Sequence, residues 1–175
     1  LHGLGQNFYV YDGKLNVFPH FSNTIFSITP DSTTQRYHFY FGDYHFPDDE
    51  IFQKKEYNSQ AIMSEIMNNS YVRLMAPYET DEHLLVKYYV KRQVLLGIYN
   101  KKKHTAINLD PEMVIDSLHL GTFPVPIGFN HNEFIGQLTL DIQQKNRIMI
   151  PELQKLMADY SEDSNPILIF YSLRS

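Results

Sequence analysis

The stretch from Gln6 to Gly42 limits the fold of this chain more than any other part of it. It contains four runs rich in Tyr, Phe, Val, Ile and Thr, which are separated by turn-forming residues. The dipeptide Asp12-Gly13 between two such runs is a strong hairpin signal, because both residues of such a turn adopt positive φ. The stretch therefore predicts an antiparallel meander of four strands. The expected strands cover residues 7–11, 14–19, 24–29 and 35–41.

The same pattern returns between Tyr71 and Leu109. The second-strand segments that begin at Lys14 and Leu84 are 70 positions apart. When an insert of roughly 20 residues is subtracted, the period is about 50 residues, the size of one four-stranded propeller blade. The expected strands of this second unit cover residues 71–76, 83–90, 93–99 and 104–109.

A third unit, over residues 123–173, is incomplete. Pro124, Pro126 and Gly128 predict a loop over residues 110–128. Residues 133–140 repeat the second strand of a unit, about 49 residues after the equivalent segment at Leu84. Residues 167–173 supply a third strand, and no fourth strand follows.

Two segments interrupt the strand pattern and predict helical inserts near residues 48–69 and 151–160. The first begins with three acidic residues, which match the positive end of a helix. The second begins with Pro151, which suits a first helical turn, and its apolar residues keep helical spacing.

These observations predict an all-β chain of β-propeller type with about two and three-quarter blades. The repeat units cover residues 6–42, 71–109 and 123–173, either as one domain over 1–175 or as the C-terminal half of a larger propeller. A stack of three blades does not close a ring, and an open blade face or edge is sticky. Further blades, a second copy packed face to face, or the helical inserts are the candidates for covering these faces.

The composition excludes several classes of protein. The 13 Tyr and 12 Phe favour strands, and the absence of Cys excludes a disulfide framework and thiolate chemistry. A net charge of −5 argues against a nucleic-acid surface. The basic run from Lys101 to His104 falls where a hairpin turn is expected. No apolar run reaches the roughly 18 residues of a membrane-spanning helix, so we expect no transmembrane segment.

Three segments resemble a known family. The residues Tyr11-Asp12-Gly13-Lys14-Leu15, those from Ser22 to Ile28, and those from Arg36 to Gly42 are similar to late blades of six-bladed, NHL-like β-propeller proteins of Bacteroides-type bacteria. The segment from Leu153 to Ile169 resembles the C-terminal helix, turn and last strand of that family.

The resemblance implies a secreted protein or lipoprotein in the periplasm or on the outer cell surface, without an established activity. It transfers no catalytic residue. The chain departs from these propellers because it is about half as long, and they close by pairing the last blade with a strand from the beginning of the chain.

No motif for catalysis, a metal or a cofactor emerges, so we expect neither cofactor nor metal. His38 and His45 flank a strand end with Asp43 between them, but a metal site needs three or four converging ligands. Most aromatic residues suit the packing of blades. The candidate ligand contacts are the residues near expected loops, where propellers display function. They are Tyr44, His45, Phe46 and Tyr78.

Three hypotheses of function remain open. The first is a non-catalytic binding or scaffolding module of the bacterial cell envelope, with a carbohydrate, a peptide or an envelope protein as ligand. The second is a hydrolase or lyase with a His, Asp and Tyr site at the propeller mouth, which predicts a pocket that gathers two histidines and a carboxylate. The third is a structural half-propeller that is completed by self-association as a homodimer through its open blade faces.

Overall fold

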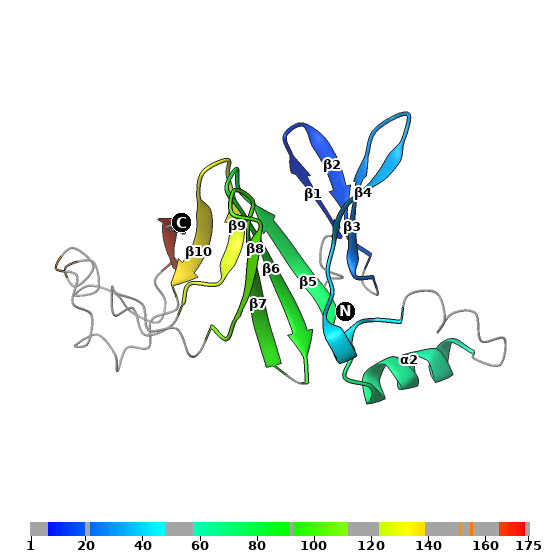
Figure 1. Cartoon of the computed structure of the whole chain (residues 1–175). Helices are drawn as coiled ribbons and strands as arrows, with labels where there is room; N and C mark the ends of the chain where they lie inside the picture. The colour runs from blue at the N-terminus through cyan, green and yellow to red at the C-terminus, as the bar shows by residue number, and fades with distance from the viewer. Residues whose placement is uncertain are drawn as a thin grey trace. The chain divides into compact units, whose positions relative to one another are not determined.

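The computed structural model shows an all-β chain built from antiparallel sheets (Figure 1). It describes residues 7–19, 22–47, 58–91, 93–111, 123–138, 151, 155 and 165–173. Three sheets follow one another along the sequence, and each lies within one of the three predicted repeat units. The antiparallel all-β architecture is thus confirmed.

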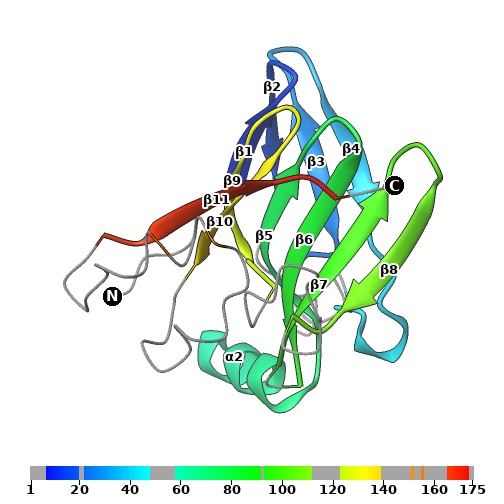
Figure 2. The same cartoon turned by 90° about the vertical axis from the view of Figure 1, so that its left-hand side faces the viewer.

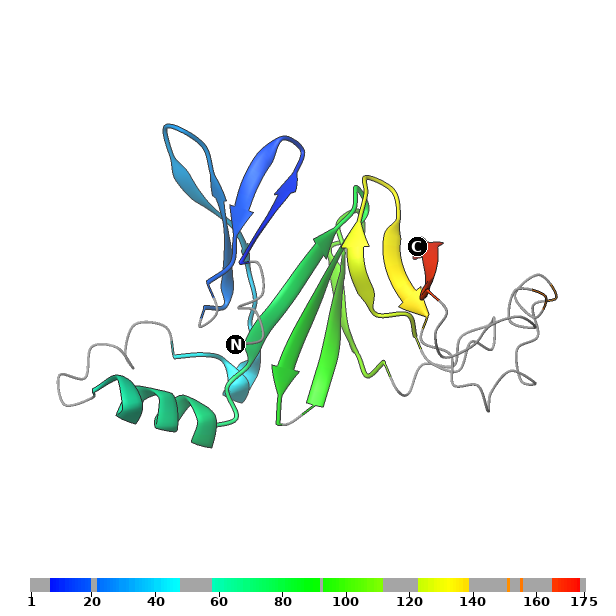
Figure 3. The same cartoon turned by 180° about the vertical axis from the view of Figure 1, so that it is seen from behind.

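The first sheet has the strand order β1-β2-β3-β4. Asp12 and Gly13 have φ values of 50° and 68°, as expected for the tight turn between β1 and β2. The fourth strand covers Thr33–His38 instead of the predicted 35–41. It ends early because the chain leaves the ladder after His38 and turns through Gly42, whose φ is 57°. The four strands, visible as two hairpins in Figure 3, are β1 (Phe8–Tyr11), β2 (Lys14–Val17), β3 (Thr24–Ile28) and β4 (Thr33–His38).

The second sheet has the order β5-β6-β7-β8 (Figure 2). Its second strand is the most buried, since Leu84, Leu85 and Val86 are at most 3% exposed. The basic run forms the predicted turn, and the Asn100 side-chain oxygen accepts hydrogen bonds from the backbone N–H groups of Lys102 and Lys103. The strands are β5 (Arg73–Glu79), β6 (His83–Val90), β7 (Gln93–Asn100) and β8 (Thr105–Leu109).

The third sheet has three strands in the order β11-β10-β9. Here the prediction of a loop up to residue 128 is wrong, because residues 126–129 form a strand. Pro126 is compatible with this strand because it is the first residue of an edge strand, where its missing N–H is tolerated. The register shifts between Ile135 and Gly136, next to Pro126. The strands are β9 (Pro126–Phe129), β10 (Phe134–Leu138) and β11 (Ile167–Tyr171).

One α-helix, α2 (Ser59–Asn68), falls within the first predicted helical insert. The side chain of Asn58 caps it by accepting a 2.9 Å hydrogen bond from the N–H of Ala61. Residues 48–57 of that insert lie outside the described residues, as does nearly all of the insert predicted near 151–160. A short 3-10 helix, η1 (Gly42–Tyr44), was not expected from the sequence.

The chain divides into two compact units, and the division passes through the second sheet. Residues 1–77 and 86–97 form the first unit, and residues 78–85 and 98–175 form the second. In the first unit, Phe46 and Ile66 are buried together, with Tyr71 packed against them. In the second unit, Phe134 is fully buried and its ring contacts that of Tyr171.

Candidate functional site

The loop that follows β4, residues 39–47, is held in place by the side chain of Asn23. Asn23 is 1% exposed, and its amide nitrogen donates a 2.8 Å hydrogen bond to the Phe46 carbonyl oxygen, while its amide oxygen accepts from the Phe46 N–H at 3.2 Å. The N–H of Phe39 donates to the Asn23 carbonyl oxygen at 2.8 Å. One buried residue therefore fixes both ends of the loop, which limits the conformational entropy that a ligand would have to remove on binding.

This loop displays an exposed tyrosine beside two imidazoles. The side chain of Tyr40 is 83% exposed, and its ring centroid lies 5.7 Å from that of His45. The His45 ring lies 5.5 Å from the His38 ring in an edge-to-face arrangement. We call Tyr40, His38 and His45 the aromatic cluster. It offers the flat, largely apolar ring of Tyr40 with the exposed imidazole of His38 in the same cluster, all in the first compact unit.

Neighbouring polar groups orient both imidazoles. His38 Nδ1 lies 2.9 Å from the hydroxyl oxygen of Thr24, which is itself buried. His45 Nε2 lies 3.1 Å from the amide nitrogen of Asn23. Because an amide N–H₂ group only donates, Nε2 of a neutral His45 is the acceptor in this contact. The His38 ring is thus placed by Thr24 of β3, and the His45 ring by Asn23, the residue before β3.

Tyr44, the first of the predicted ligand contacts, is half-buried and pairs with Lys91. The ammonium nitrogen of Lys91 lies 4.3 Å from the centroid of the Tyr44 ring, and it also donates a hydrogen bond to the phenol oxygen. The Tyr44 carbonyl oxygen accepts a 2.7 Å hydrogen bond from the N–H of Val72. A cation over a ring is stabilising but modest in strength at an exposed site, and here it covers part of the phenol.

The other predicted contacts have different surroundings. His45 belongs to the aromatic cluster, whereas Phe46 is fully buried, and its ring contacts that of Tyr71 edge to face at 5.6 Å. Tyr78 lies in the second compact unit, where burial raises the pKa of its phenol. Of the four predicted residues, the structure gathers Tyr44, His45 and Phe46 in one loop, and two of these three have exposed surface.

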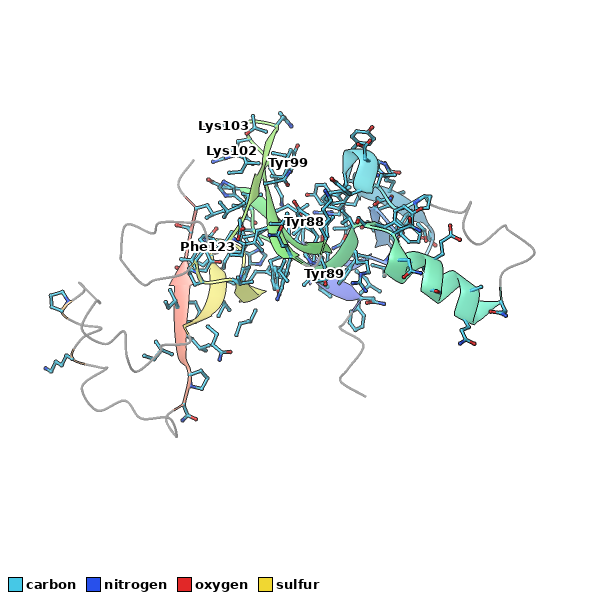
Figure 4. All side chains as sticks on the ribbon, turned by 90° about the horizontal axis from the view of Figure 1, so that it is seen from below. Tyr88, Tyr89, Tyr99, Lys102, Lys103 and Phe123 are labelled. Atoms are coloured by element: carbon cyan, nitrogen blue, oxygen red, sulfur yellow. The ribbon has the colours of Figure 1, made fainter. Side chains whose placement is uncertain are left out.

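The second compact unit has its own polar cluster at one end of the second sheet. The carboxylate of Glu79 is fully buried and lies 2.7 Å from the ammonium nitrogen of Lys101, which also donates to the Thr80 carbonyl oxygen at 2.6 Å. Lys102 makes a more exposed pair with Glu82 at 2.5 Å, which lowers the pKa of that carboxyl. Figure 4 shows Lys102 and Lys103 at this end of the sheet, near Tyr99. These contacts join the β5–β6 turn to the β7–β8 turn.

The histidines that the structure describes in the second unit lie in separate pairs with other residues. His83 is 5% exposed, and its Nε2 lies 3.1 Å from the amide nitrogen of Asn100. Burial lowers the pKa of His83, because the charged imidazole loses its hydration. His131 lies 3.7 Å from an oxygen of Asp81, and His104 contacts the Tyr99 hydroxyl at 3.0 Å. Over the ranges that the structure describes, no group of three or more His, Cys, Asp or Glu side chains could hold a metal ion.

Sequence reasoning missed Asn23, which holds the loop in place, and Tyr40, which lies within it. Asn23 lies between the expected strands 14–19 and 24–29, where the sequence indicates only a turn, and nothing local indicates that its amide reaches residue 46. Tyr40 was assigned to a strand, where alternate residues pack into a core. The available signal was Gly42, because a glycine directly after an aromatic run marks a point where the chain can leave the ladder.

Comparisons with known proteins agree with the fold and add a family. A family model described as "Domain of unknown function (DUF4934)" matches residues 2–172. A crystal structure at 2.60 Å resolution of a protein from Bacteroides fragilis NCTC 9343, provisionally described as exported, is similar with a TM-score of 0.75 at 18% sequence identity. The match covers 95% of this chain and 49% of that protein, so the chain spans about half of its length.

Curated proteins gave no match to this chain. Within the part of the chain that the structure describes, no helix combines the length and the apolar character needed to cross a lipid bilayer.

Proposed function

The chain belongs to the DUF4934 family, and from this premise we propose that it is a non-catalytic binding and scaffolding module of the bacterial cell envelope. The observation that carries the proposal is the rigid display of Tyr40 beside His45 and His38. Binding residues are commonly carried on loops that a rigid scaffold positions.

The proposed scaffold is a set of β-propeller blades related to the six-bladed, NHL-like proteins. Three successive antiparallel sheets of four, four and three strands support it, as does the similarity to a structure about twice as long. We place the module in the periplasm or on the outer cell surface. The provisional description of that similar protein as exported supports this placement.

The proposed ligand is a carbohydrate. A sugar ring has an apolar C–H face, which suits the exposed ring of Tyr40, and hydroxyl groups, which suit the polar imidazole of the exposed His38. A peptide is the second class of ligand to be tested. A hydrolase or lyase is the alternative function; His38 and His45 lie together in the first compact unit, whereas the Asp81–His131 pair belongs to the second.

The test is calorimetric titration of the chain with a panel of soluble oligosaccharides and, separately, of peptides. We expect at least one oligosaccharide to bind, and Tyr40→Ala to weaken that binding at least about tenfold, which is 1.4 kcal/mol. Ile107→Ala is the matched control, because Ile107 is also an exposed apolar side chain, 58% exposed, but belongs to β8. A panel in which no compound binds, or equal effects of the two substitutions, would contradict the proposal.

A further inference from the structure

Two turns of the second compact unit are closed in the same way by an asparagine. In each, the side-chain oxygen accepts hydrogen bonds from the backbone N–H groups two and three positions further along the chain. For Asn100, at the end of β7, the distances are 3.0 Å and 2.8 Å. For Asn130, after β9, they are 3.0 Å and 2.9 Å. In such a turn the side-chain oxygen takes the place of a backbone acceptor.

The two turns differ in what lies beside the amide nitrogen. That of Asn100 lies 3.1 Å from Nε2 of His83, and both residues are buried. An amide nitrogen only donates, so Nε2 accepts this hydrogen bond and carries no proton. The Asn100 amide cannot rotate to change this without taking its oxygen away from the two backbone N–H groups of the turn. The amide nitrogen of Asn130 instead lies 3.5 Å from a carboxylate oxygen of Glu133, which is an acceptor.

The charged groups around His83 belong to the same end of the second sheet. The carboxylate of Glu82 favours the charged imidazole, whereas the ammonium groups of Lys101 and Lys102 oppose it. Lys102 pairs with Glu82, and Lys101 with the buried carboxylate of Glu79. Burial is the largest influence and also opposes protonation, so the pKa of His83 lies below its ordinary value.

The backbone of the β7–β8 turn depends on support from its surroundings. His104, the last residue of this turn, has a φ of 54°, in the left-handed region that favours glycine. Such a conformation persists only while neighbouring contacts hold it. Nδ1 of His104 lies 3.0 Å from the hydroxyl oxygen of Tyr99, and a hydroxyl can either donate or accept. This contact therefore tolerates protonation of His104, whereas the contact between His83 and Asn100 does not tolerate protonation of Nε2.

We propose that His83 makes the β7–β8 turn an acid-sensitive switch, which is closed while Nε2 accepts from Asn100 and opens when Nε2 takes up a proton from solvent. A protonated Nε2 sets one donor against another, and the Asn100 amide relieves this conflict only by releasing the backbone N–H groups of the turn. The ion pair of Glu79 with Lys101 does not involve the imidazole, so opening is confined to residues 102–104. The switch lies in the second compact unit and does not depend on ligand binding at the aromatic cluster.

The experiment is amide hydrogen exchange followed by nuclear magnetic resonance, expressed as protection relative to an unstructured peptide. We expect the two N–H groups held by Asn100 to lose protection about tenfold between about pH 7.5 and about pH 5, because opening that takes up one proton becomes more favourable below the ordinary pKa of His83. The two N–H groups held by Asn130 are the internal control and should keep their protection. A parallel loss at both turns would overturn the proposal, since the opening would then not be local.

A single substitution is expected to reverse the effect. Asn100→Asp keeps one oxygen for the backbone N–H groups of the turn and places a second oxygen, an acceptor, where the amide nitrogen faces His83. A carboxylate has an ordinary pKa near 3.9 and stays charged at about pH 5, so it accepts from the protonated imidazole. Protection of the turn should therefore rise in this variant as pH falls. A loss of protection equal to that of the wild type would contradict the proposal.

Two further variants assign the effect to one histidine. His83→Gln has no titratable ring, so the loss of protection at acid pH should disappear. His104→Gln should retain the loss, because His104 is expected to keep its contact in both protonation states. The opposite result in either variant would overturn the proposal, and circular dichroism verifies that each variant is folded. If His83→Gln does not fold, the sign of the effect in Asn100→Asp decides. No ligand enters these measurements, so failure of the switch is distinguishable from failure of oligosaccharide binding.

Discussion

The loop after β4 and the turns at one end of the second sheet are both organised by a buried polar side chain, but the two side chains have different consequences. Asn23 is neutral, and its amide holds the backbone at Phe46 and the ring of His45, while Tyr40 of the same loop remains exposed. Glu79 is charged, and it binds Lys101 from the facing turn, so both side chains are used in joining the two turns. A buried amide can therefore shape a surface for another molecule, whereas a buried ion pair consumes the groups that it brings together.

The largest effect is expected when the ion pair is broken. Glu79→Ala leaves the mostly buried ammonium of Lys101 without its carboxylate, and removal of one partner from a buried pair costs about 3–5 kcal/mol. Urea unfolding measures this loss. Glu82→Ala, which removes the exposed partner of Lys102, should change the midpoint very little. A similar loss in both variants would mean that burial does not distinguish the two pairs.

A smaller effect is expected for the amide. Asn23→Ala removes the two hydrogen bonds that the Asn23 amide makes with the buried backbone of Phe46, and loss of such a partner costs about 1–3 kcal/mol. Asn130→Ala is the control, because the Asn130 oxygen also accepts from backbone N–H groups but in an exposed turn. Oligosaccharide binding should fall in Asn23→Ala and persist in Asn130→Ala. Intact binding in Asn23→Ala would show that the amide does not organise the loop.

Because of His83, the free energy of unfolding is expected to depend on pH. Its pKa is lowered in the folded chain by burial, so below its ordinary value near 6.5 the unfolded chain binds the extra proton more readily. The free energy of unfolding should therefore decrease as pH falls from about 7 to 5, and it should be insensitive to His83 above that range. Lys101 and Lys102 add to the lowering, whereas Glu82 opposes it.

The measurement is the difference in urea midpoint between wild type and His83→Gln at several pH values. If the difference between the two proteins did not change with pH, protonation of His83 would not be coupled to folding.

The smallest effect on stability is expected at the aromatic cluster. Tyr40 is 83% exposed, and surface substitutions away from special contacts usually change stability by less than about 0.5 kcal/mol. Tyr40→Ala should therefore unfold at the wild-type urea concentration although it loses ligand binding. A marked fall in its unfolding midpoint would assign Tyr40 a structural role and would remove the contrast with Glu79.

Strand positions could largely be predicted from the sequence, because Asp12-Gly13 and the alternating aromatic runs act over a few residues. The face that each strand buries could not. In Phe8-Tyr9-Val10-Tyr11 both alternating sets are apolar or aromatic, so periodicity alone does not select the buried side. Asn16 is also misleading. A lone polar residue between Leu15 and Val17 suggests an exposed side chain, yet the side chain of Asn16 is fully buried.

Features of the candidate site were only partly predictable. Tyr44 and His45 were chosen for their position near an expected loop, and the structure has them in the loop after β4, but position alone could not show that Phe46 turns inward to Ile66 and Tyr71. The partners of Asn23 lie 16 to 23 residues along the chain, beyond the reach of any local pattern. The strand at Pro126 was missed because proline indicates a loop unless the strand is known to lie at an edge.

At Gly136, in the third sheet, there is almost no space for a side chain. A Cβ atom at this position would lie 2.9 Å from the Pro124 side chain and 3.2 Å from both the Pro124 carbonyl oxygen and the Tyr171 ring. That same carbonyl oxygen accepts a 2.6 Å hydrogen bond from the Tyr171 hydroxyl, so the ring and the backbone cannot withdraw independently. Among chains that keep this sheet, even alanine is excluded at position 136 unless the backbone at 124 moves as well. The room for a side chain at position 136 is therefore set by the packing of Pro124 and Tyr171.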